Sequence, residues 1–355
     1  MTRTATTLIL GLLLASAALT RAAEPASPAD RADAAPTAAE AASDARFEAD
    51  YQALQATLIE QMIGSANPRD WVMAPDSSSP ERHTRLIRAA EAAPDDALVQ
   101  WIAAHAVSGT AQSSGPFDPV AERIIGQLSA LQPDNAAHLM PALIHARRQS
   151  DAVTVDRLLA SMAARSRFDI HFADSLHAWA ALASRSDTAA TLDAMAALAA
   201  LQEGETFDPA MSALVVGVAN SAAVMPTFYQ DLSLACHPAD DLAAQTRRVD
   251  DCEKIARLMT SQSQTMIDRM IGDALLRKLE RQSDADRALR RRWEWLMETF
   301  AEIQSEVGTG ATFVEAWRNN NDELAVMTHT VQAAGIPLDP PADWISRSEA
   351  RTQNL

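Results

Sequence analysis

The sequence predicts an all-α protein. From Phe47 onward, apolar residues recur every three or four positions, as one buried helix face requires. Glycine occurs only 11 times in 355 residues and aromatic residues make up 5%, whereas alanine is abundant. This composition favours packed helices over β-sandwiches, β-barrels and Rossmann-type folds, which need β-branched runs and glycine turns.

The first 22 residues predict a secretory signal peptide. Arg3 is followed by a short apolar run and then by small residues. The run is too short to span a bilayer comfortably, and no cysteine ends it, which disfavours a lipoprotein. We expect cleavage after Ala22, with a cut near Ala18 and an uncleaved anchor as alternatives. A periplasmic or secreted location follows, without stable membrane insertion after cleavage.

Residues 23–46 predict a flexible leader. They combine alanine with Pro25, Pro28 and Pro36 and contain almost no large apolar residue. Such a segment cannot bury enough surface to offset the entropy lost on ordering. The folded part is therefore expected to begin near Phe47.

Residues 47–205 predict a series of short helices with short connections. Acidic or amide residues stand before the apolar faces and suit helix N-caps. These start signals are Pro94-Asp95-Asp96, Pro133-Asp134-Asn135, Ser150-Asp151 and Asp169.

Two of these start signals recur as a repeat. The stretch from Pro94 to Trp101 aligns with that from Pro133 to Met140 at an offset of 39 residues, and a weaker third start follows at Phe168. Each unit has room for two antiparallel helices that must stack on their neighbours.

Residues 80–205 resemble tetratricopeptide-like (TPR-like) helical repeats. Pro94 and Pro133 stand where that family ends a repeat with proline, and Ala89 and Ala121 where it keeps small packing residues. The aromatic and glycine positions of the family's first helix are not matched. The resemblance implies an α-solenoid with a concave surface for a peptide or protein; an ordinary helical bundle is the alternative.

Residues 206–355 predict a C-terminal helical region with one disulfide. Residues 211–225 form an apolar stretch, and a methionine-rich amphipathic stripe follows between Ile255 and Leu279. Cys236 and Cys252 are the only cysteines, and an even pair in an oxidising compartment favours a disulfide. The alternatives, a redox pair or a metal site, lack Cys-x-x-Cys spacing or further nearby ligands.

The net charge of −17 disfavours nucleic acid and anionic lipid as partners and suits a basic protein. Tryptophans and one arginine are the candidate anchors of a binding surface. These candidates are Trp101, Trp179, Arg290, Trp293 and Trp295. A solvated helix face, with Arg290 to Arg292 paired to nearby acids, is the simpler interpretation of the last three.

Motifs for chemistry are missing from the sequence. It contains no Gly-x-Ser-x-Gly, His-Glu-x-x-His, Walker or EF-hand pattern, and no two histidines have the spacing that clasps a metal. We therefore expect no cofactor and no metal, and a non-catalytic interaction protein of scaffold or inhibitor type. The alternatives are an envelope hydrolase that uses paired groove carboxylates on a glycan, and a small-ligand binder.

Overall fold

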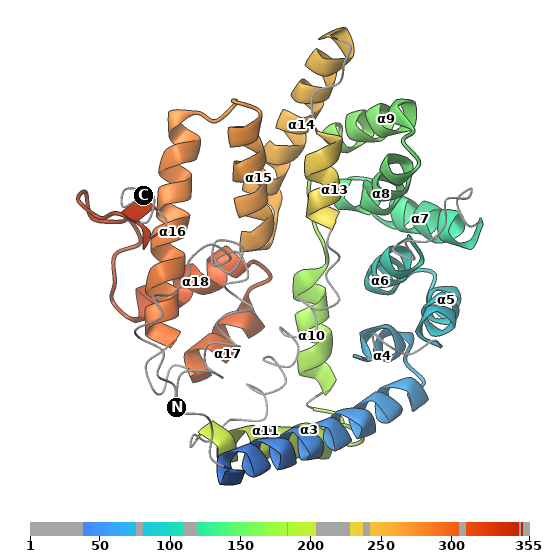
Figure 1. The fold of residues 1–355 in the computed structure, drawn as a ribbon, viewed down its shortest axis with the longest axis vertical. Coiled ribbons are helices and arrows are strands. Elements are labelled where there is room, and N and C mark those ends of the chain that lie inside the picture. The colour runs from blue at the N-terminus through green and yellow to red at the C-terminus, as the bar shows by residue number, and fades with distance from the viewer. Residues whose placement is uncertain are drawn as a thin grey trace. The chain divides into compact units, whose positions relative to one another are not determined.

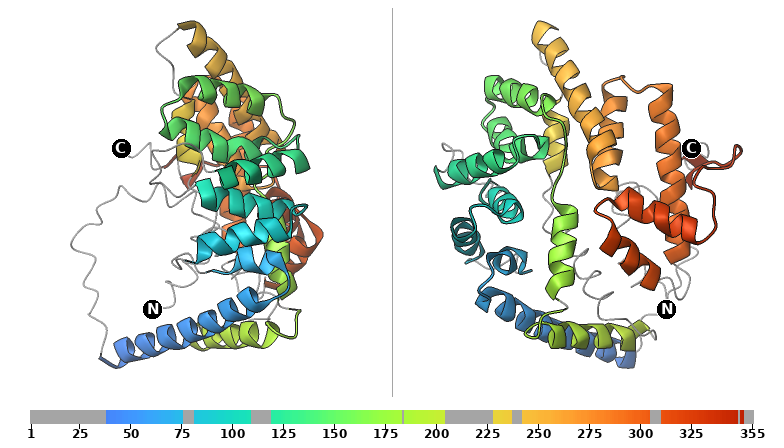
Figure 2. Two further views of the ribbon diagram at one scale, coloured as in Figure 1. Left: turned by 90° about the vertical axis from the view of Figure 1, so that its right-hand side faces the viewer. Right: turned by 180° about the vertical axis from the view of Figure 1, so that it is seen from behind.

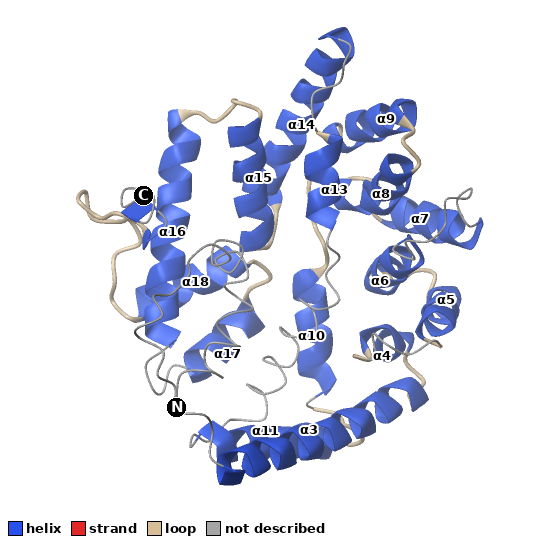
Figure 3. Cartoon of the chain, in the orientation of Figure 1, coloured by secondary structure: helices blue, strands red, loops and turns tan. Residues whose placement is uncertain are grey.

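The computed structural model describes residues 38–75, 81–108, 119–182, 184–203, 228–236, 242–304, 310–347 and 349–350. All regular elements among these residues are helices, so the all-α prediction is confirmed (Figure 3). The one β-type pairing among them is an isolated bridge between Asn135 and Arg167. The predicted signal peptide and the apolar stretch 211–225 lie outside the described residues.

The chain divides into two compact units. Unit 1 comprises Met1–Ser79 and Ser175–Val224, and unit 2 comprises Pro80–Asp174 and Met225–Leu355. Both units combine segments from either side of residue 205, so this division differs from the predicted one. The difference arises because later helices fold back onto earlier ones.

Unit 1 is built from helices of both its chain segments. Its described helices are α3 (Ala38–Gly64), α4 (Pro68–Met73), most of α10 (Phe172–Leu182) and α11 (Ala189–Glu203). Helices α3 and α11 lie side by side (Figure 1). Arg185 pairs with Asp70, and Thr191 Oγ1 donates to Gln61 Oε1 at 3.1 Å. Helix α3 begins at Ala38, within the predicted leader.

Unit 2 contains two runs of helices. The first is α5 (Arg82–Ala92), α6 (Ala97–Ser108), α7 (Pro119–Leu131), the 3₁₀ helix η2 (Ala136–Leu139), α8 (Met140–Arg148) and α9 (Ala152–Ala163). The second is α13 (Phe228–Ala235), α14 (Leu242–Gln262), α15 (Met266–Lys278), α16 (Asp284–Gln304), α17 (Gly310–Asn319) and α18 (Glu323–Ala333).

Neighbouring elements of the first run pack against one another from α5 to α9. Helix α13 then packs on α8, and α14 on α9, so the second run continues from the predicted repeat region (Figure 2). A TPR-like solenoid stays a prediction.

The predicted helix starts are confirmed by their caps. Asp96 Oδ1 accepts from the amide of Leu98 at 3.1 Å, and Asn135 Oδ1 from that of Ala137 at 3.1 Å. Asp151 caps α9 at the amide of Thr154, at 3.0 Å. These side chains satisfy amides that an isolated helix end leaves unpaired, which is why the starts can be recognised in the sequence.

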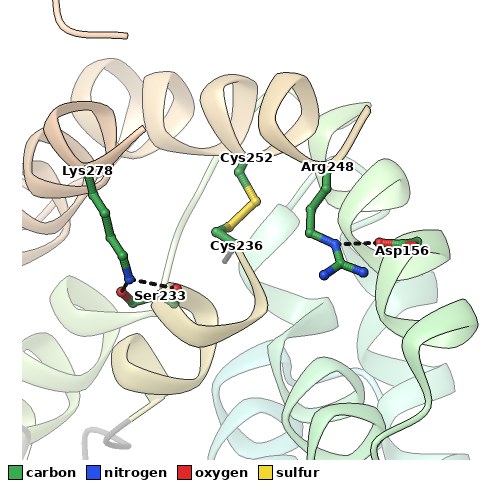
Figure 4. Close-up of a disulfide and its surroundings, with 6 residues drawn as sticks. All are labelled: Asp156, Ser233, Cys236, Arg248, Cys252 and Lys278. Carbon is green, nitrogen blue, oxygen red and sulfur yellow. Dashed lines mark hydrogen bonds and ion pairs between the residues drawn. A yellow bond between two sulfur atoms is a disulfide. The ribbon is translucent and has the colours of Figure 1, made fainter. Parts of the chain in front are cut away.

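The predicted disulfide is confirmed. Cys236, which directly follows α13, and Cys252 in α14 have an Sγ–Sγ distance of 2.04 Å and a Cα–Cα distance of 5.8 Å (Figure 4). On one side Arg248 Nε donates to Asp156 Oδ1 at 2.7 Å and ties α14 to α9. The disulfide therefore links α13 to α14 where both pack on the first run. Among the described helices, none has the length and apolar character needed to cross a bilayer.

Candidate functional site

Three tryptophans proposed as surface anchors are buried. Trp101, Trp179 and Trp293 expose 4%, 0% and 1% of their surface. The prediction of exposed anchors at these positions is therefore corrected. The reason is visible in α16, where Trp293 shares a buried apolar face with Leu296 and Phe300.

Arg290 and Trp295 remain partly accessible, but both have partners. Arg290 Nη2 lies 2.9 Å from Glu294 Oε1, and its Nε lies 3.8 Å from Asp273 Oδ2. This matches the simpler interpretation of a paired helix face. The indole N–H of Trp295 donates to the carbonyl of Pro337 at 2.9 Å, which brings in a segment far along the chain.

That segment is residues 336–347, here called the C-terminal segment, which follows α18 and returns to α16. One guanidinium holds most of it. Arg291 Nη2 donates to the carbonyls of Pro341 at 2.7 Å, Ala342 at 3.2 Å and Trp344 at 2.7 Å. These are all main-chain acceptors, so the recognition depends on the path of the backbone.

Aromatic and ionic contacts complete this attachment. The rings of Trp295 and Trp344 meet edge to face with centroids 5.5 Å apart, and the Arg291 Cζ lies 5.7 Å from the Trp344 centroid. Arg292 Nε lies 3.3 Å from Asp339 Oδ1. We call Arg291, Arg292, Trp295 and Glu298 the docking face.

Glu298 contributes to the docking face through the last residue of the segment. Its Oε1 accepts from the backbone amide of Arg347 at 2.8 Å. The Nη2 of Arg347 also lies 2.8 Å from Glu302 Oε1, one turn further along α16. The docking face thus offers positive charge at one end and negative charge at the other.

A second polar assembly is buried between the helices of unit 2. We call Trp101, His105, His138 and His171 the histidine cluster. The Nε2 atoms of His138 and His171 are 2.9 Å apart, and the Trp101 and His105 ring centroids are 4.0 Å apart. Residues 138 and 171 each follow a capped repeat start, which is how positions 33 apart come together.

Hydrogen bonding sets the tautomer of His138. Asn135 Oδ1 accepts from the amides of Ala137 and Asp169, so its Nδ2 faces His138 Nε2 at 2.9 Å and donates to it. The His138 Nδ1 then carries the hydrogen and donates to the carbonyl of Leu128 at 3.1 Å.

The other ring nitrogen of His171 faces a carboxylate. Its Nδ1 lies 2.8 Å from Asp174 Oδ2, whose side chain is 56% exposed. His171 therefore lies between exposed Asp174 and buried His138. His138 is fully buried, so no substrate reaches this base in the structure.

Burial favours the neutral form of His105 and His138 in this cluster. It lowers the pKa of His105 to about 3. Burial, followed by the charge of His171, lowers the pKa of His138 to about 2. Both shifts have the direction expected when a base loses its hydration.

A third assembly joins α13, α15 and α18. We call Tyr229, Ser263, Thr265, Asp268 and Glu323 the acidic cluster. Asp268 accepts from the Tyr229 hydroxyl at 2.7 Å, from Ser263 Oγ at 2.5 Å and from Thr265 Oγ1 at 2.7 Å. Glu323 Oε2 accepts from the backbone amide of Met266, the first residue of α15, at 2.7 Å. Both carboxyl groups thus bind at the N-terminus of α15.

Burial dominates the acid–base behaviour of this cluster. It raises the pKa of Asp268 to about 6, although three hydroxyl groups donate to it, and the charge of Asp169 adds to the rise. It raises the pKa of Glu323 to about 7, assisted by the charges of Asp322 and Asp268. Asp268 is fully buried and its carboxyl group is occupied by these hydroxyl groups, while Glu323 caps the first amide of α15.

An open depression lies on α18, with a cavity volume of about 360 Å³. Its lining residues are Asp322, Leu324, Ala325, Thr328, His329 and Gln332. None of these residues belongs to the docking face, the histidine cluster or the acidic cluster. Within the described part of the chain, no group of three or more His, Cys, Asp or Glu residues is arranged to hold a metal ion.

Sequence reasoning missed both buried assemblies, although each left a signal. Thr265-x-x-Asp268 has capping-box spacing, which predicts that the Thr265 hydroxyl accepts from the backbone amide of Asp268, as it does at 3.2 Å. His138 and His171 sit just after aligned repeat starts. In each case the second partner comes from another helix, which local patterns do not reveal.

No protein-family model matches the chain, and neither a curated protein nor a solved structure is significantly similar to it.

Proposed function

We propose that this is a non-catalytic, periplasmic or secreted protein that binds another protein through the docking face of α16. The observation that carries the proposal is the seating of a separate, non-helical segment on that face by one arginine and one indole. Main-chain carbonyls are common to every polypeptide, so a face that reads them suits a protein ligand.

Two further observations support the proposal. Trp295 and Arg291 are of the residue types that dominate binding energy at interfaces, and both are accessible enough to contact a ligand. The disulfide and the predicted signal peptide fit an oxidising compartment. The hydrolase alternative gains nothing from Asp268 and Glu323, because their carboxyl groups accept from the protein's own hydroxyl groups and from the amide of Met266.

Photo-crosslinking in the producing cell tests this proposal. A photoreactive amino acid replaces Ala288, an exposed residue seven positions before Trp295 and therefore on the same side of α16. The matched control carries it at Val153, which is 80% exposed on α9. We expect one dominant adduct from position 288 that is missing from position 153.

The double variant Arg291→Ala/Trp295→Ala is expected to abolish that adduct. Identical adducts from both positions, or an adduct that survives the double substitution, would show that the docking face does not bind a protein.

A further inference from the structure

We infer that the docking face binds a proline-containing turn of the partner, and that the C-terminal segment is a tethered copy of that ligand. The inference rests on the proposed function and specifies the chemistry of the partner. It is drawn from how residues 336–347 are held.

Proline suits the positions that this segment occupies. Pro337 and Pro341 each supply a carbonyl to the docking face, and Pro340 lies between them. The segment turns here, because the amide of Trp344 donates to the carbonyl of Pro341 at 3.1 Å. A proline ring holds φ near −65°, so less conformational entropy is lost when such a turn is ordered on binding.

Charged contacts define the flanks of the ligand. Arg292 faces Asp339 beside the prolines, and Glu298 and Glu302 face Arg347 at the far end. The preferred segment therefore carries an acidic residue near its prolines, a tryptophan and then a basic residue. This local preference differs from the basic partner expected from the net charge of the whole chain.

The C-terminal segment is held in a way that permits exchange. Most of its residues are exposed, and Ile345 exposes 50% of its surface. Helix α18 is closed by the first residue of the segment, because the amide of Ile336 donates to the carbonyl of Val331 at 3.2 Å and Gly335 adopts φ +73°. This closing turn satisfies the helix end, so the residues after Ile336 can leave without unwinding α18.

A tethered ligand lowers the apparent affinity for a free one. The segment is present at high effective concentration, and a partner binds only to the fraction of molecules in which the face is open. Weakening the segment therefore strengthens binding of the same sequence supplied in trans.

The test uses the full-length chain and a fluorescein-labelled synthetic peptide with the sequence of residues 336–347, followed by fluorescence anisotropy. Trp344→Ala removes the ring that contacts Trp295 and Arg291 and so opens the face. We expect this variant to bind the peptide at least about tenfold more tightly than the wild-type chain.

Adding Arg291→Ala to Trp344→Ala is expected to abolish binding. Adding Arg123→Ala instead is the control, because it removes an exposed arginine of α7 that pairs with Glu91. A peptide with all three prolines replaced by alanine is expected to bind several-fold more weakly.

The wild-type chain provides a second measurement that does not depend on how well Trp344→Ala folds. It should bind the peptide saturably at higher concentration, and Arg291→Ala alone should remove that binding. Failure of the peptide to bind either chain, or equal binding with and without Arg291, overturns the inference. The crosslink from position 288 is independent of this result, so the proposed function stands or falls separately.

Discussion

The histidine cluster and the acidic cluster are both buried in unit 2, yet their pKa values move in opposite directions. Burial lowers the pKa of His105 and His138, and it raises the pKa of Asp268 and Glu323. The physical cause is the same in both places, because loss of hydration disfavours whichever protonation state is charged. Burial therefore favours the neutral form of each of these four groups.

The two clusters are electrically adjacent. Asp169 Oδ1 accepts from the backbone amide of His171 at 2.8 Å, and the charge of Asp169 raises the pKa of Asp268. One region of the core of unit 2 therefore holds histidines whose pKa is lowered beside carboxyl groups whose pKa is raised.

Their effects on stability have opposite signs. Below about pH 6.5 the unfolded chain protonates His105 and His138, which stay neutral in the fold, so these two histidines contribute less to stability as the pH falls. Asp268 and Glu323 bind protons more tightly when folded, so the acidic cluster loses stability as the pH rises from about 4 to about 7. The two contributions oppose each other between about pH 4 and 6.5.

The largest expected effect comes from the disulfide, which supports the acidic cluster and not the histidine cluster. The disulfide anchors α13, the helix whose Tyr229 hydroxyl donates to Asp268, whereas no disulfide joins the helices of the histidine cluster. We expect Cys236→Ser/Cys252→Ser to lower the free energy of unfolding by about 3 kcal/mol, measured by urea denaturation. An unchanged midpoint would show that other contacts hold α13 in place.

The next effect concerns the packing that supports the acidic cluster. A Cβ at Gly272 of α15 would lie 2.7 Å from the carbonyl oxygen of Ala256 and 2.8 Å from the Cβ of Met259. We expect Gly272→Ala to cost about 1–3 kcal/mol by forcing α14 and α15 apart, measured by thermal unfolding.

Gly126→Ala is the matched control for Gly272→Ala. Gly126 is an exposed residue of α7, and a Cβ there meets nothing within 4 Å. This change is expected to stabilise the protein by up to about 1 kcal/mol, through helix propensity alone. Equal effects at both glycines would contradict the close approach of α14 and α15.

A smaller, pH-dependent effect isolates the acidic cluster. Asn at position 268 mimics the protonated carboxyl group, so Asp268→Asn should cost more stability near pH 4 than near pH 7. The loss of unfolding free energy caused by Asp268→Asn is expected to shrink by about 1.4 kcal/mol per pH unit as the pH rises from about 4 to 6, measured by urea unfolding across that range. A cost that does not vary with pH would show that folding does not raise the pKa of Asp268.

His138→Gln should show the opposite trend. Glutamine retains one donor and one acceptor, and it cannot be protonated as the unfolded histidine is. The cost of this substitution is expected to shrink by about 1.4 kcal/mol per pH unit as the pH falls below about 6.5. His329→Gln, on the exposed side of α18, serves as the control in the same titration.

The smallest effect lies outside both clusters. Trp344→Ala removes contacts of a mostly exposed segment, so we expect it to change the free energy of unfolding by less than about 1 kcal/mol. Faster hydrogen exchange confined to residues 336–347 is the accompanying signature. Global destabilisation would place the segment among the structural elements of unit 2.

Local signals in the sequence were sufficient for some of these features. The caps at Asp96 and Asn135, and the disulfide between Cys236 and Cys252, follow from residue types at short spacing. The burial of Trp293 does not follow from the sequence alone, because the same spacing suits an exposed anchor and a core residue. Its burial depends on which face of α16 the rest of unit 2 covers.

The sequence by itself determined the all-α class, the starts of several helices and the cysteine pairing, because helical period, capping and chain proximity act over a few residues. Only the tertiary structure decided that His138 meets His171, that Glu323 caps α15 and that residues 336–347 return to α16. Those contacts join positions tens of residues apart. They exist because packing brings the helices together, and desolvation in that packed interior then sets the charge of each buried group.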